Sequence, residues 1–142
     1  MDLAEFTKRL RVAWGEFVKG NPDPAKEAYS RRDDVTLANP FGPAVRGWDK
    51  VAETLDSASS RLSDGEALGF ETLAEYASED LVTILEIEHW RARVGDNEEV
   101  LPFDLRVTST FRREENEWKL VHRHADPITT FDPGGPLRNS RG

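Results

Sequence analysis

Three stretches near the C-terminal end of the sequence decide the fold: LVTILEIEHWRAR at residues 81–93, LPFDLRVTSTFRR at residues 101–113 and WKLVHRHA at residues 118–125. Each is rich in the β-branched, aromatic and aliphatic residues that favour strands, and short polar turns separate them. A similar stretch precedes them at residues 68–77. The sequence therefore predicts a meander of four long antiparallel strands.

Upstream of the meander, the apolar pattern changes to the three-to-four-residue spacing of amphipathic helices. The three expected helices cover residues 2–19, 23–29 and about 47–62, and a small hairpin is expected from residues 35–38 and 44–46. Asp2 is the expected N-cap of the first helix, and Ser63-Asp64-Gly65 is expected to end the third. Helices early and a strand meander late predict an α+β fold with the helices on one sheet face.

Composition limits the classes of partner. The 142 residues suffice for one domain, assigned to residues 1–131, with a flexible C-terminal tail at 132–142. A net charge of −8 disfavours nucleic acid, and no apolar run approaches the roughly 20 residues that cross a bilayer. The chain has no cysteine, which excludes disulfides and thiolate metal sites, and shows no leader-like start, so a cytoplasmic protein is expected.

Particular motifs carry a family resemblance over residues 3–127. They are Asp34-Val35-Thr36, Pro40-Phe41-Gly42, Arg106-Val107-Thr108, Phe111-Arg112-Arg113 and the closing Trp118–His124. These resemble the hairpins of SnoaL-like domains, and the closing motif is similar to the end of the association domain of calcium/calmodulin-dependent protein kinase II. The resemblance implies the cystatin-like, nuclear-transport-factor-2-like cone, in which three N-terminal helices pack on a strongly curved antiparallel sheet. That superfamily holds isomerases, dehydratases, cyclases, hydrolases and assembly modules, so fold alone does not assign a function.

Strand alternation divides the sheet into two faces. With an assumed register, Glu86, Arg106 and Arg123 share a mixed face, whereas the other face is apolar. The apolar face is expected to carry Phe103, Leu105, Val107 and Phe111. The mixed face has two interpretations: a solvated surface with ion pairs, such as Glu86 with Arg106 or Arg123, or the lining of a cone-shaped cavity. The resemblance favours the cavity.

The cavity interpretation yields a set of candidate site residues. Glu86 and His124 are the candidate acid or base groups. The candidate ligand contacts are Tyr76, Trp90, Arg106, Thr108, Arg123, His122, Asn39 and Trp48. His122 and His124 could instead be structural, or could bind a metal together with His89 and a carboxylate. Neither a metal nor a cofactor is assigned to the site.

Two functions stay open at this point. One is binding of an unknown small molecule, with cofactor-free proton transfer as the possible chemistry: isomerisation, dehydration, cyclisation or hydrolysis. The other is a non-catalytic oligomerisation or regulatory module with a vestigial pocket. Both predict a homodimer formed through the outer, apolar sheet face, because a bare face of that kind is too large for a typical monomer.

Overall fold

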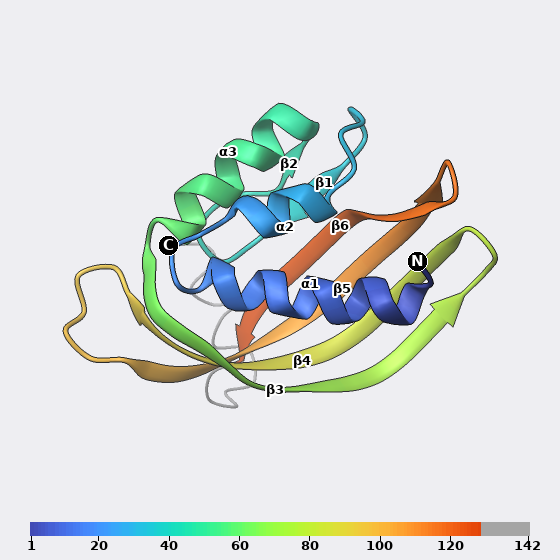
Figure 1. Ribbon diagram of the computed structural model, residues 1–142. Coiled ribbons are helices and arrows are strands. Elements are labelled where there is room, and N and C mark those ends of the chain that lie inside the picture. The colour runs from blue at the N-terminus through green and yellow to red at the C-terminus, as the bar shows by residue number, and fades with distance from the viewer. Residues whose placement is uncertain (129–142) are drawn as a thin grey trace, which may run out of the picture.

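The computed structural model describes residues 1–128, so the predicted tail at 132–142 lies outside the described residues. Three helices, α1 (Leu3–Phe17), α2 (Asp23–Ala28) and α3 (Trp48–Ser59), lie on the concave side of a curved sheet (Figure 1). The expected α+β fold is therefore confirmed. None of the helices within residues 1–128 has the length and apolar character needed to cross a membrane.

The sheet has six strands in the order β2-β1-β6-β5-β4-β3. Their bounds are β1 (Thr36–Ala38), β2 (Val45–Arg46), β3 (Leu62–Ala77), β4 (Leu81–Val94), β5 (Leu101–Glu114) and β6 (Glu117–Ile128). Strands β3 to β6 form the expected antiparallel meander. The small hairpin of β1 and β2 joins it because β1 runs parallel to β6.

Helix α1 begins as its sequence predicts, and its apolar stripe fills the hollow of the sheet. The Asp2 carboxylate accepts a hydrogen bond from the Glu5 backbone N–H at 2.9 Å, which makes it the N-cap. Phe6, Leu10 and Trp14 are buried, and the Phe6 ring meets Phe111 of β5 edge to face at 5.7 Å between centroids. Burial of one face therefore stabilises α1, which is too short to be stable as an isolated helix.

The register between β4 and β5 corrects the predicted grouping of side chains. Glu86 lies opposite Val107, so odd-numbered residues of β5 share the concave face with even-numbered residues of β4. The expected outer apolar residues are therefore on the concave face: Val107 and Phe111 are buried, and Phe103 and Leu105 pack against the core. Arg106 and Thr108 point to the opposite, outer face.

A bulge in the pairing of β5 with β6 changes the faces once more. Thr110 lies opposite His122, but Phe111 lies opposite Leu120, so Val121 is the extra residue. Leu120 therefore faces the core, whereas simple alternation would place it on the same face as His122. Beyond the bulge, Arg123 is on the concave face, as expected.

Two predicted boundaries are wrong. Helix α3 ends at Ser59, and residues 63–65 begin β3 instead of ending the helix, because Leu62 and Ser63 pair with Val94 and Arg93 of β4. Strand β6 continues to Ile128, beyond the stretch predicted at residues 118–125, so Asp126 and Pro127 are part of it. Pro127 pairs with Leu105 on one side, while β1 ends opposite His124, so the missing N–H of Pro127 faces a side of β6 that β1 leaves unpaired.

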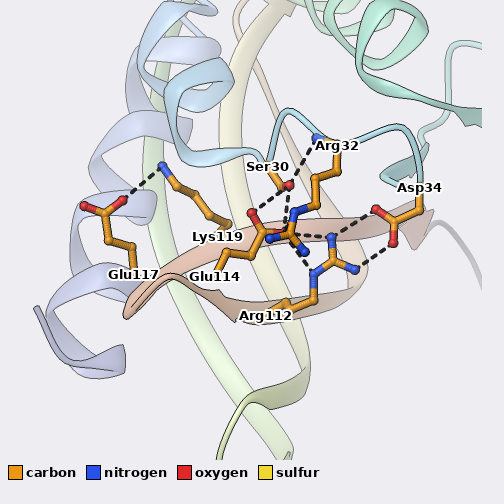
Figure 2. A network of polar contacts seen from close by, with 7 residues as sticks. All are labelled: Ser30, Arg32, Asp34, Arg112, Glu114, Glu117 and Lys119. Carbon is orange, nitrogen blue, oxygen red and sulfur yellow. Dashed lines mark hydrogen bonds and ion pairs between the residues drawn. The ribbon is translucent and has the colours of Figure 1, made fainter.

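A network of ion pairs fixes the segment that leads into β1 (Figure 2). The Arg112 guanidinium on β5 donates to Asp34 at 2.7 and 3.0 Å and also bonds Glu114. The Glu114 carboxylate in turn accepts from the buried Ser30 hydroxyl at 2.9 Å and lies 3.6 Å from Arg32. These bonds lower the pKa of Asp34, chiefly through Arg112, and hold residues 30–34 on the meander.

A close approach of α1 to β3 makes Gly65 a sensitive position. A Cβ at Gly65 would lie 2.4 Å from the Val18 carbonyl oxygen, which is backbone and cannot rotate away. We expect Gly65→Ala to lower the free energy of unfolding by about 1–3 kcal/mol, measured by urea denaturation. Gly15→Ala is the control, because nothing lies within 4 Å of its Cβ and alanine favours the helix interior. Equal stability of the two variants would contradict this packing.

Candidate functional site

A cavity of about 250 Å³ lies between the concave sheet face, α1, α3 and the loop after β1. Its walls are apolar and largely aromatic, with rings from Trp14, Phe17, Phe41, Trp90 and Phe103. Among its lining residues, Asn39 and Arg123 are the ones with a side-chain amide or charge. A concave cavity with an apolar lining and few polar groups is typical of a small-molecule site.

The Arg123 charge in the cavity wall is balanced by Glu88. Nη1 and Nη2 of Arg123 each donate to one Glu88 oxygen at 2.8 Å, and the two side chains are only 8% and 1% exposed. The Trp90 indole N–H donates to the same carboxylate at 2.9 Å, and the guanidinium lies 4.1 Å from the ring centroid of Trp14. Burial alone would raise the pKa of Glu88, but Arg123 and Trp90 outweigh it and lower the pKa, so the pair is ionised.

Glu86, the predicted acid or base, is in a different environment. Its carboxylate accepts from Arg11 of α1 at 3.1 Å, and the Arg11 guanidinium also lies over Phe70, 4.6 Å from the ring centroid. Burial and the neighbouring charge of Glu88 raise the pKa of Glu86, although Arg11 opposes the shift. Glu86 is not among the residues that line the cavity, and its expected partners Arg106 and Arg123 are replaced by Arg11.

The structure brings together three of the predicted ligand contacts and separates the others from them. Trp90, Arg123 and Asn39 all line the cavity. Trp48 is outside it, beneath the Arg31 guanidinium at 3.9 Å. Tyr76 lies near the far end of β3 and is 68% exposed, so it contacts no part of the cavity.

The remaining candidates lie on the outer sheet face. Arg106 and His124 both approach Asp126, at 3.8 and 3.2 Å, and His122 shares a 2.8 Å hydrogen bond with Thr36. Thr108 lies opposite His124 on the same face. Burial and the nearby His124 lower the pKa of His122, which favours its neutral form.

His89 is also on the outer face, apart from the other two histidines. Its ring contacts Asp104 at 2.6 Å and Glu71 at 3.4 Å, and the hydrogen bond with Asp104 raises its pKa. Within the part of the chain that the structure describes, no group of three or more His, Asp or Glu side chains is arranged to hold a metal ion.

With this geometry established, comparison with known proteins gives the family. The model of the SnoaL-like domain matches residues 17–129. The chain belongs to the SnoaL-like domain family. Among curated proteins, no sequence matches it significantly.

Solved structures confirm the nuclear-transport-factor-2-like fold of this SnoaL-like protein. A putative calcium/calmodulin-dependent protein kinase II association domain from Thiobacillus denitrificans is 21% identical, with a TM-score of 0.71 over 89% of this chain and 95% of that one. A nuclear-transport-factor-2-like protein from Salmonella enterica is 18% identical, with a TM-score of 0.73 over 92% of each chain. A ketosteroid isomerase-like protein from Erwinia carotovora is 17% identical, with a TM-score of 0.73 over 90% of this chain and 95% of that one. Identities this low establish the shared fold only.

Sequence reasoning passed over Glu88, the residue that controls the charge of the cavity wall. A signal was present, because Glu88 alternates with apolar residues on the same face as Glu86 and Trp90. A buried acid in such a strand needs a buried base, and Arg123 is the basic residue on the concave face of β6. The sequence does not show which glutamate pairs with Arg123, because that depends on the position of α1, whose Arg11 contacts Glu86.

The two glutamates are expected to differ in their effect on stability. Glu88→Gln leaves the buried Arg123 charge uncompensated and should lower the free energy of unfolding by about 3–5 kcal/mol. Glu86→Gln should change it by less than about 1 kcal/mol, because the Arg11 side chain is 37% exposed and ion pairs with an exposed member contribute little. Urea denaturation at neutral pH measures both.

The pH dependence of stability should differ between the two glutamates, because their pKa values are shifted in opposite directions. The lowered pKa of Glu88 means that its contribution to stability is present above the ordinary glutamate pKa and is lost as the pH falls through the lowered value. The raised pKa of Glu86 means that its contribution is present below the ordinary value and is lost as the pH rises through the raised one. As the pH rises toward the ordinary glutamate pKa of about 4.3, the wild type should therefore gain stability relative to Glu88→Gln. As the pH rises further, above that value, the wild type should lose stability relative to Glu86→Gln. The same slope for both variants would show that the two environments are assigned incorrectly.

Proposed function

We propose that this SnoaL-like protein binds a small, mostly apolar organic molecule in the cavity between α1, α3 and the sheet. The observation that carries the proposal is the combination of an aromatic wall with one buried, ion-paired arginine. A vestigial pocket would be expected to have collapsed, since buried space without contacts lowers stability.

The wall is organised before any ligand arrives. Trp90 is fixed by its hydrogen bond to Glu88, and Trp14 is held beneath Arg123. Phe17 meets Trp14 edge to face at 5.2 Å between ring centroids. Rings that are already fixed lose little conformational freedom on binding, which favours affinity.

Binding accounts for the wall better than proton transfer does. A general base must reach the proton that it removes. Among the residues that line the cavity, Arg123 is the ionisable one, and its partner Glu88 is 1% exposed, with a lowered pKa and both oxygens occupied. Glu86 has the raised pKa suited to a base, but it contacts Arg11 instead of the cavity. The isomerase-like name of one relative therefore does not extend to this site.

Filling the cavity provides the test. Leu105→Trp on β5 places a larger side chain in the wall and should reduce affinity for cavity ligands more than tenfold, since the same space cannot be occupied twice. A screen of neutral aromatic fragments by protein-detected NMR, read from the indole N–H signals of Trp14 and Trp90, measures binding. The control is Leu73→Trp on β3, at a side chain that is 61% exposed and is not part of the cavity lining.

The screen can also contradict the proposal. If no fragment shifts the Trp14 and Trp90 signals, the cavity is not a ligand site. If bound fragments keep their affinity in Leu105→Trp, they bind elsewhere on the protein.

A second function, pairing of two copies, is supported by the outer sheet face. The helices cover only the concave side (Figure 1). The outer face of β4 and β5 presents half-buried Leu85 and Ile87 beside Thr83 and Thr110, whose hydroxyls are 3.0 Å apart. We propose that two copies pair through this face about a two-fold axis, with these residues replacing the apolar set that the sequence indicated.

Ile87→Lys tests the pairing, because a charge at the centre of an apolar interface is costly to bury. The wild type should sediment as a dimer and Ile87→Lys as a monomer in analytical ultracentrifugation. Val12→Lys is the matched control on α1, at a side chain 67% exposed, and should remain a dimer. A monomeric wild type, or a dimer that survives Ile87→Lys, would refute pairing through this face.

A further inference from the structure

The guanidinium of Arg123 has donors that its protein partner does not use. An arginine carries five N–H donors. Among residues 1–128, the hydrogen bonds of this guanidinium are the two to Glu88, one from Nη1 and one from Nη2. The side chain is 8% exposed and lines the cavity, so the remaining N–H groups meet little solvent. Among residues 1–128, the buried side-chain nitrogen without any hydrogen-bond partner is Arg11 Nε and not a nitrogen of Arg123. Arg123 lines the cavity, so its N–H groups that Glu88 leaves free can donate to an acceptor that a ligand supplies there.

The charge of Arg123, in contrast to its donors, is already neutralised. Glu88 binds it with two parallel hydrogen bonds, the strong bidentate arrangement. Glu86 and Arg11 form a second ion pair nearby, so the net charge of the two pairs is zero. An anionic ligand would lose its hydration and would meet Glu88 as well as Arg123. A neutral acceptor has no such desolvation cost.

The ligand's other contacts follow from the walls. Trp14, Trp90 and Phe103 line the same cavity as Arg123. Aromatic side chains pack best against other flat, apolar groups, in stacked or edge-to-face arrangements. The cavity of about 250 Å³ is small, so the ligand is compact.

We propose that the cavity selects uncharged carbonyl compounds with a compact ring, whose carbonyl oxygen accepts a hydrogen bond from Arg123, and that it discriminates against carboxylates of the same shape. This inference rests on the proposed small-molecule function of the cavity and adds the chemical class of the ligand. It concerns recognition alone and includes no covalent step.

Three probes of nearly equal shape test the proposal: acetophenone, which is a neutral ketone; isopropylbenzene, which has no acceptor; and benzoate, which is an anion. All three have the same number of non-hydrogen atoms, so their packing in the cavity is comparable. A charge-assisted hydrogen bond supports an affinity ratio of about tenfold or more. We therefore expect acetophenone to bind at least about tenfold more tightly than either of the others, in NMR titrations of the wild-type protein followed at the Trp90 indole and the Arg123 Nε–H signals.

Each other result has a defined meaning. If benzoate binds as tightly as acetophenone or more tightly, Arg123 acts as a free cation and the proposed ligand class is wrong, although the cavity is still a ligand site. If isopropylbenzene equals acetophenone, Arg123 donates nothing and the class is again wrong. If none of the probes shifts the Trp90 signal, the proposed function fails together with this inference.

A double variant checks that the preference arises at Arg123. Glu88→Gln combined with Arg123→Met removes both buried charges together, which avoids leaving either one uncompensated. It should bind acetophenone and isopropylbenzene about equally. Arg106→Met is the matched control, because Arg106 lies on the next strand with its side chain on the outer face and 64% exposed, and it should keep the ketone preference. A ketone preference that survives in the double variant, with its fold verified by circular dichroism, would overturn the proposal.

Discussion

The buried pair of Glu88 and Arg123 is the interaction on which the rest of the structure depends. Arg123 lies opposite Ser109 and Glu88 opposite Leu105, so the pair crosses β5 diagonally and joins two strands that do not touch. Neither charge can be left alone in the interior, because an unpaired buried ion costs several kcal/mol. The registers of β4, β5 and β6 are therefore fixed relative to one another, and α1 is fixed to them by the stacking of Trp14 on the guanidinium.

The cavity follows from this arrangement together with the anchoring of β1. A strand of three residues has few ladder bonds of its own. Its position next to β6 is supported by the Arg112, Asp34 and Glu114 network just before it (Figure 2) and by Tyr29, whose hydroxyl donates to the Thr36 carbonyl at 2.9 Å. The loop after β1 then carries Asn39 and Phe41 to the cavity. Polar contacts at one end of the molecule thus position an apolar wall at the other.

The sequence was sufficient for the elements and the fold, but only in part for the site. Helical and strand periodicities are local, so α1 and the meander could be predicted from their own residues. Which residues share a face depends on the register, and that is fixed by turn length and by the bulge at Val121, neither of which alternation reveals. An offset of one residue between β4 and β5 was enough to place Arg106 and Thr108 in the cavity and Phe103 outside it. Arg123 was grouped with Glu86 through the same assumed register, and it still lies on the face of Glu86 and Trp90, because the offset between β4 and β5 and the bulge between β5 and β6 compensate for each other.

The separation of the two glutamates also determines what kind of chemistry the cone can support. A carboxylate that is to remove a proton must be buried enough for its pKa to rise and open enough to touch a ligand. In this protein the two requirements fall on different residues, since Glu86 has the raised pKa and Glu88 is next to the cavity wall. Because Arg123 fixes Glu88 in the ionised, fully bonded state, the polar group that faces the cavity is a hydrogen-bond donor and not a base. A carboxylate base in this cavity would require an unpaired Asp or Glu at a lining position, and the ion pair with Arg123 keeps Glu88 from that role.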